Sequence, residues 1–187
     1  EEAFALDLGR MLNLELKELV RAGATRLQID EPYFSGFPED LPWALKAINE
    51  MVAGVNAHVT LHICYGNRYG KPSFEGSYQF LFPPILEAKV QAVSMEFARR
   101  GEDDLKLFKE FNVPFQVAIG VIDVKTNEVE SPGFVADRIR RGLDVIGPER
   151  LIITPDCGLV RLPRDVAFSK LSAMAEGTRS VRKELGR

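Results

Sequence analysis

Two kinds of hydrophobic pattern alternate along the chain. Longer stretches carry apolar side chains at the spacing of an amphipathic helix, and the short runs between them are rich in β-branched residues. The predicted helices are Leu8–Ala22, Leu41–Val55, Tyr78–Ala88, Asp103–Phe111, Gly133–Ile146 and Pro163–Glu184. The predicted strands are Thr25–Asp30, His58–Tyr65, Ala92–Ala98, Phe115–Asp123 and Leu151–Cys157. This alternation predicts repeated βα units, and therefore an α/β protein with a parallel sheet.

The polar positions within the strands favour one α/β architecture over another. In the strand that ends near Cys64, apolar residues alternate with Thr60, His62 and Cys64, so the polar side chains share one face. A doubly wound sheet buries both faces under helices, whereas a (βα)8 TIM barrel encloses one face and builds its site at the carboxyl ends of the strands. The pattern therefore predicts a (βα)8 barrel.

The number of units sets how much of the barrel is present. A full barrel takes about 250 residues, and this chain has 187 residues with five predicted strands. It begins with Glu inside a helical pattern. We therefore expect residues 1–187 to supply the last five βα units, the C-terminal part of one catalytic barrel, with the N-terminal strands absent from this sequence.

Composition narrows the classes of partner. The chain has 24 Lys and Arg against 27 Asp and Glu, a net charge of −3, and no basic block, so nucleic acid is not an expected partner. The longest apolar stretches, such as Val117–Ile122, are far shorter than the roughly 18 residues of a membrane span. A cytoplasmic protein is the expectation. Only two cysteines are present, which leaves free thiols, one disulfide or metal ligands.

The residues with the most reactive chemistry end predicted strands. His62 and Cys64 form a His-x-Cys pair on one strand, Cys157 ends another, and Glu96 ends a strand between them. In a barrel these ends converge, and one imidazole, two thiolates and a carboxylate suit Zn²⁺ better than Mg²⁺ or Ca²⁺. Two alternatives remain open on spacing alone: a core histidine with two buried free cysteines, or a disulfide between Cys64 and Cys157.

Several short strings, read together, resemble one enzyme family. They are Ile29–Pro32 (Ile-Asp-Glu-Pro), His62–Tyr65 (His-Ile-Cys-Tyr), the strand of Glu96, Gly120–Asp123 (Gly-Val-Ile-Asp) and Pro155–Leu159 (Pro-Asp-Cys-Gly-Leu). In order and spacing they resemble the catalytic C-terminal barrel of cobalamin-independent methionine synthase, and the resemblance covers essentially the whole chain.

The resemblance implies a zinc-dependent methyltransferase. It implies zinc bound by His62, Cys64, Glu96 and Cys157, and Asp30 bound to the amino group of homocysteine. Zinc would hold the homocysteine thiol as a thiolate, which would accept a methyl group and give methionine. The methyl donor would be a methylfolate or a methylcorrinoid. We also expect one protein ligand, Glu96, to loosen when the thiol enters.

Two positions depart from the family pattern on the donor side. Lys125 stands where these synthases carry a histidine, and Gly36 stands where they carry a folate-binding glutamate. The Lys125 variant is similar to short single-barrel relatives and to epoxyalkane:coenzyme M transferases. Lys125 is therefore a predicted catalytic residue, with an exposed salt bridge as its alternative role. Alkyl transfer to another thiol, such as epoxide opening by coenzyme M, and a non-catalytic metal-binding half-barrel remain the alternative functions.

Overall fold

The computed structural model describes all 187 residues and contains one five-stranded parallel sheet. Its strands are β1 (Arg26–Glu31), β2 (His58–Ile63), β3 (Ala92–Met95), β4 (Gln116–Ile122) and β5 (Leu151–Pro155). Every neighbouring pair is parallel, and the strands lie side by side in chain order. A doubly wound sheet reverses its order at a switch point, whereas a barrel does not. The sequential order confirms the predicted barrel-type α/β fold.

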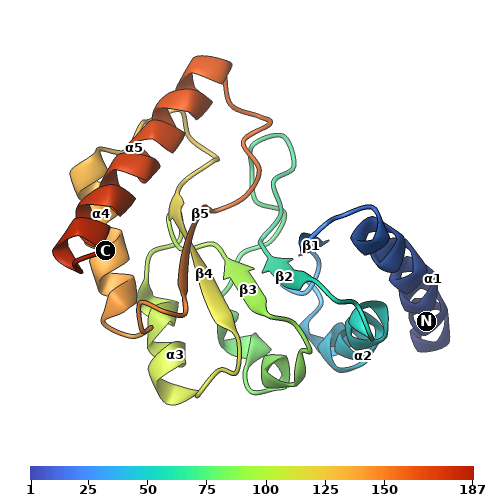
Figure 1. Cartoon of the computed structure of the whole chain (residues 1–187). Coiled ribbons are helices and arrows are strands. Elements are labelled where there is room, and N and C mark those ends of the chain that lie inside the picture. The colour runs from blue at the N-terminus through green and yellow to red at the C-terminus, as the bar shows by residue number, and fades with distance from the viewer.

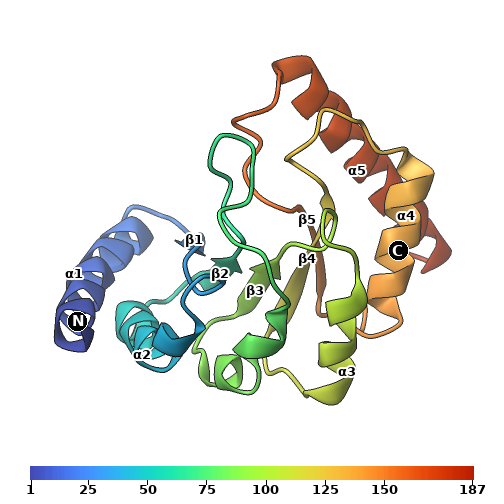
Figure 2. The ribbon, with the colours of Figure 1, turned by 180° about the vertical axis from the view of Figure 1, so that it is seen from behind.

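The helices surround the outside of the curved sheet (Figure 1). They are α1 (Glu2–Arg21), α2 (Leu41–Val52), α3 (Leu107–Glu110), α4 (Pro132–Leu143) and α5 (Arg164–Glu184). Helices α1 and α2 pack together at one end of the sheet and α4 and α5 at the other, as the opposite view also shows (Figure 2). No helix combines the length and the apolar character that crossing a membrane requires.

The predicted helix Tyr78–Ala88 was wrong. This segment forms two short 3₁₀ turns, Tyr78–Leu81 and Pro84–Glu87, instead of one α-helix. Pro83 and Pro84 interrupt it, because proline lacks the N–H that a helix interior requires and disfavours the α conformation in the residue before it.

Two other helices differ from their predicted ranges. The first helix begins at Glu2 instead of Leu8. The segment predicted as Asp103–Phe111 is a 3₁₀ turn, Asp103–Lys106, followed by the single turn of α3.

The core is deepest at the centre of the sheet. All four residues of β3 are buried, and β4 is buried after its first residue. At the edges, β1 alternates between exposed and half-buried residues, and every residue of β5 is half-buried. The central strands are therefore held rigidly, while the outer sides of β1 and β5 carry no neighbouring strand.

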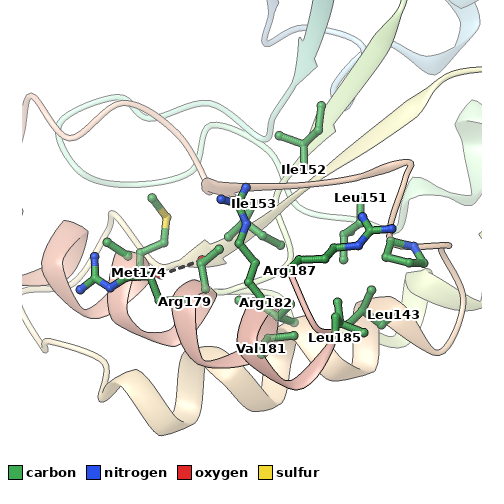
Figure 3. A pocket seen from close by; sticks show the side chains of 14 residues that line it. Leu143, Leu151, Ile152, Ile153, Met174, Arg179, Val181, Arg182, Leu185 and Arg187 are labelled. Atoms are coloured by element: carbon green, nitrogen blue, oxygen red, sulfur yellow. Dashed lines mark hydrogen bonds between the residues drawn. The ribbon is translucent and has the colours of Figure 1, made fainter.

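A cavity lies at the β5 edge, away from the predicted site. It measures about 550 Å³ and is lined by residues of β5, α4 and α5, including Leu151, Ile153 and Met174, with Arg179 and Arg182 beside them (Figure 3). None of the residues that line it is a predicted site residue. This cavity is therefore separate from the polar residues at the strand ends.

Candidate metal and thiol site

Three predicted ligands converge at the carboxyl ends of two strands. His62 lies in β2, Cys64 follows that strand directly, and Cys157 follows β5. A ligand atom from each lies within 4.8 Å of the other two, and both cysteines are free thiols. Two strands separate β2 from β5, so a flat sheet would hold these groups roughly 14 Å apart, three strand spacings of about 4.8 Å. The curvature of the sheet therefore builds the site.

One nitrogen of His62 is held and the other is left without a partner. Nδ1 lies 3.2 Å from Oδ1 of Asp30. Because an ionised carboxylate can only accept, this contact places the proton on Nδ1 and leaves Nε2 as an acceptor. Nε2 is buried and has no hydrogen-bond partner. A buried imidazole nitrogen of this kind, oriented by a carboxylate on its other nitrogen, fits a metal ligand.

The two thiols form a hydrogen bond with each other. This bond and the backbone amide of Gly158 lower the pKa of Cys157, although burial acts in the opposite direction. The same thiol–thiol contact and burial raise the pKa of Cys64. Cys157 is therefore the more acidic of the two thiols. A soft divalent ion binds the deprotonated form of a thiol, so this acidity favours Cys157 as a ligand.

Glu96, the fourth predicted ligand, is paired with a lysine. Its carboxylate is fully buried at the end of β3, and Lys125 Nζ donates to both of its oxygens at 2.9 Å. The backbone N–H of Tyr65, the residue after Cys64, also donates to Glu96 Oε1 at 3.3 Å. Glu96 thus lies beside the three-ligand group without belonging to it. The Lys125 side chain is only 3% exposed, so the alternative of a surface salt bridge was wrong.

A chain of contacts holds the loop that carries Lys125, and sequence reasoning missed it. The N–H of Lys125 donates to Asp123, and the N–H of Asp123 donates to Glu130 Oε1 at 2.9 Å. Lys170 of α5, fully buried, donates from Nζ to Glu130 Oε2 at 2.9 Å and to the carbonyl of Glu128. Helix α5 therefore fixes the position of a site residue from outside the sheet.

A sequence signal for Lys170 was present. Lys170, Ala173, Gly177 and Val181 share one buried stripe of α5 at the helical spacing. A lysine in the apolar stripe of a helix is rarely fully buried unless it is paired. Such a position therefore indicates a buried anionic partner elsewhere in the chain.

Asp156 is a second residue that sequence reasoning did not single out. It is buried, and its carboxylate accepts the backbone N–H groups of Phe97, Ala98 and Arg99 at 2.9 to 3.0 Å. Burial raises its pKa to about 7, although these three amide hydrogen bonds act in the opposite direction. Asp156 precedes Cys157, and Phe97 follows Glu96. This side chain therefore ties the end of β5 to the end of β3.

The substrate-side residues lie at the rim. The Asp30 carboxylate is 72% exposed and accepts from Gln28 Nε2 at 2.7 Å, so it remains accessible while it orients His62. Gly36 lies against the ring of Phe74, and a β-carbon there would fall 2.2 Å from that ring. The ring thus fills the space that a side chain at position 36 would need.

The loops after β2 and β5 lie side by side above the site, as both views show (Figures 1 and 2). Asn67 Nδ2 donates to the carbonyl of Gly158 at 3.1 Å, and Arg161 stacks over the ring of Tyr69 at 5.4 Å. These contacts join the loop that follows Cys64 to the loop that follows Cys157.

Known proteins resemble this chain over nearly its whole length. Residues 1–180 match the family described as "Cobalamin-independent synthase, Catalytic domain". The chain is 41% identical over 181 residues to the methionine synthase of Saccharolobus islandicus strain Y.G.57.14, covering 97% of this chain and 52% of that protein. For the methionine synthase of Sulfurisphaera tokodaii the identity is 37%, with 97% and 50% covered. The chain spans about half the length of the curated relatives it matches.

Solved structures agree with these sequence matches. A B12-independent methionine synthase from Shewanella sp. W3-18-1, in complex with selenomethionine, superposes with a TM-score of 0.89 at 30% identity, covering 98% of this chain and 56% of that one. A putative vitamin-B12-independent methionine synthase from Listeria monocytogenes superposes with a TM-score of 0.67 at 18% identity, covering 92% and 52%, which shows a likeness in fold alone.

Proposed function

Because the chain belongs to the family of cobalamin-independent synthase catalytic domains, we propose that it carries the thiol-activating site of a zinc-dependent methyltransferase that converts homocysteine to methionine. The observation that carries this proposal is the group of His62, Cys64 and Cys157, whose ligand atoms lie within 4.8 Å of one another. Its unpartnered imidazole nitrogen and its two hydrogen-bonded thiols fit a soft divalent cation.

Different residues would bind the metal and the substrate. His62, Cys64 and Cys157 would hold the zinc, and Glu96 is the adjacent carboxylate that could add an oxygen ligand. Zinc bound there would supply a Lewis acid that stabilises the substrate sulfur as a thiolate near neutral pH. Asp30 orients His62 and presents an exposed carboxylate to the ammonium group of an amino-acid substrate.

Homocysteine is favoured over an amine-free thiol. The accessible carboxylate of Asp30 suits a substrate with an ammonium group, and the Shewanella relative was solved with selenomethionine, an analogue of methionine. Epoxide opening by coenzyme M would instead call for a free cation near the site, and the ammonium of Lys125 is already paired with Glu96. The methyl donor we propose is a methylfolate or a methylcorrinoid.

We also propose that residues 1–187 are the C-terminal part of a single barrel. The relatives are about twice as long as the matched segment, and both edges of the sheet are open. Further strands paired with β1 and β5 would close the barrel around the polar strand ends.

The zinc site is tested by Cys157→Ser in the full-length protein. We expect the wild type to bind one zinc per chain and to methylate homocysteine when methylfolate or methylcobalamin is supplied. Cys157→Ser should lose both properties, because an alcohol is a far poorer zinc ligand than a thiolate. Thr60→Ser, a change in β2 outside the ligand group, is the matched control and should keep both. Full activity in a protein stripped of zinc would refute the proposal.

A competition assay distinguishes the thiols. We expect homocysteine to react faster than coenzyme M, and Asp30→Asn to raise the KM for homocysteine more than it changes the reaction of the amine-free thiol. If coenzyme M reacted faster, the methionine assignment would be wrong. A protein that binds zinc but alkylates neither thiol would instead indicate the non-catalytic alternative.

A further inference from the structure

Glu96 has one cationic partner and lies near the position proposed for a second. One is Lys125, whose ammonium reaches both carboxylate oxygens at 2.9 Å in a contact that is almost fully buried. The other would be a metal ion held by His62, Cys64 and Cys157. The N–H of Tyr65, the residue after Cys64, donates to Glu96 Oε1, which fixes how close the carboxylate lies to the three-ligand group. With a metal bound by that group, one carboxylate would face two neighbouring positive charges.

Lys125 is rigidly placed for this contact. Its backbone is held through Asp123 and Glu130, and Glu130 is held in turn by the buried Lys170 of α5. The ammonium therefore remains close to Glu96 whichever partner the carboxylate has. A buried carboxylate without a cation carries a large desolvation free energy. Glu96 can therefore leave one cation with little loss of free energy only if the other cation is close enough to bind it.

We propose that Lys125 is the alternative partner of Glu96, and that by taking this carboxylate it keeps the fourth position of the cage of His62, Cys64 and Cys157 exchangeable for the substrate thiol. The proposal rests on the proposed function, because it assumes that the cage holds zinc. In this role Lys125 is a positioning residue that acts through Glu96, and the proton of the thiol need not pass through it.

The consequence can be measured without turnover. If Lys125 is replaced by an uncharged side chain, Glu96 loses the ammonium that donates to both of its oxygens. The carboxylate should then stay on the metal, which makes metal binding tighter and thiol entry harder. Changes to residues around a ligand typically alter metal affinity by about 10- to 100-fold, which sets the size of effect to expect.

The experiment compares Lys125→Met, Glu96→Gln and the double variant with the wild type in the full-length protein. Zinc affinity is measured by competition with a chromophoric chelator. Thiol entry is measured by titrating the Co²⁺-substituted protein with homocysteine and following the sulfur-to-cobalt charge-transfer absorption. Lys125→Gln is made in parallel, because it keeps a polar side chain if the methionine variant does not fold, and circular dichroism reports the fold of each protein.

We expect Lys125→Met to bind zinc about 10- to 100-fold more tightly and to need a correspondingly higher homocysteine concentration for half-saturation. In the Glu96→Gln background the same substitution should change neither quantity, because no carboxylate remains to be held. Unchanged affinity and half-saturation in both lysine variants would overturn the inference, and so would an effect that persists without Glu96.

The two proposals fail in different ways. A wild type that binds zinc and methylates homocysteine, with lysine variants that match it in both titrations, would overturn the role of Lys125 alone. A wild type that binds no zinc would overturn both. A wild type that binds zinc but methylates no thiol would overturn the methyltransferase, while the zinc affinities of the variants would still decide whether Lys125 competes for Glu96.

Discussion

Asp156 shows how a single buried side chain connects two parts of the site. Its carboxylate accepts three consecutive backbone N–H groups from the segment after Glu96, and the next residue in the chain is Cys157. Two of these N–H groups donate to Oδ1 and the third donates to Oδ2, so both oxygens of the side chain are used. The positions of Glu96 and Cys157 are therefore coupled through a residue that need not touch the metal.

Asp156→Asn tests this coupling. The amide keeps the shape of the side chain, but its NH₂ group cannot accept, so at least one buried N–H loses its partner. We expect a loss of about 1 to 3 kcal/mol in the free energy of unfolding, measured by urea denaturation of the metal-free protein. Zinc affinity should fall as well, because Cys157 is no longer held in register with Glu96.

Asp137→Asn is the matched control for that substitution. Asp137 lies on the exposed side of α4, where it pairs with Arg140. An exposed ion pair contributes at most about 1 kcal/mol, so zinc affinity should not change and stability should change little. Equal losses in the two variants would contradict the role assigned to Asp156.

At the scale of elements, the packing of α5 on α4 decides where the loop of Lys125 lies. Gly177 is buried at this crossing, and a β-carbon there would lie 2.7 Å from the carbonyl oxygen of Pro132 and 2.8 Å from Val135 Cγ1. The two helices can therefore approach closely only because position 177 has no side chain. Lys170, two turns earlier on the same stripe of α5, reaches Glu130 from this position.

Gly177→Ala should destabilise the protein. Alanine is the better helix former by about 1 kcal/mol, so a gain is expected if helix propensity decides the outcome. Overpacking at the crossing opposes this gain and typically costs about 1 to 3 kcal/mol. We expect a lower midpoint in urea.

Gly133→Ala supplies the comparison for Gly177→Ala. Gly133 is in the first turn of α4, and the nearest atom to a β-carbon there is Ser131 Oγ at 4.0 Å. With space available, alanine should be neutral or slightly stabilising. If both alanine variants stabilised the protein equally, close approach at position 177 would not matter.

At the scale of the whole molecule, both edges of the sheet and one helix face are open. Helix α1 carries several apolar side chains on its exposed side, with Phe4 75% and Met11 69% exposed. The outer edges of β1 and β5 leave backbone groups free to pair with another strand. Exposed apolar surfaces and open strand edges of this kind normally contact another part of a structure.

The 187-residue chain expressed by itself should therefore self-associate. Sedimentation velocity over a range of concentrations should show species larger than a monomer. Met11→Glu should reduce the association, because it replaces exposed apolar surface with a charge and removes no core contact. Ser169→Glu, which adds the same charge at an exposed polar position of α5, should not. A chain that remained monomeric at high concentration would contradict this expectation.

Local patterns predicted most of the fold. The five strands appeared within a few residues of their predicted ranges, because alternating apolar positions and helical spacing are set by neighbours along the chain. The segment Tyr78–Ala88 failed for an equally local reason, since two adjacent prolines outweighed its helical spacing. In principle, that outcome could also have been read from the sequence.

The candidate site was also predicted only in part from local patterns. The sequence by itself determined that His62, Cys64, Glu96 and Cys157 would all stand at the carboxyl ends of parallel strands, since strand periodicity decides which face and which end a residue occupies. Only the tertiary structure decided that three of them meet, through the curvature of the sheet, while Glu96 pairs with Lys125. The three amide partners of Asp156 and the anionic partner of Lys170 became visible only there as well. Contacts between distant segments depend on sheet curvature, helix packing and the burial of opposite charges together, and no pattern of neighbouring residues encodes these.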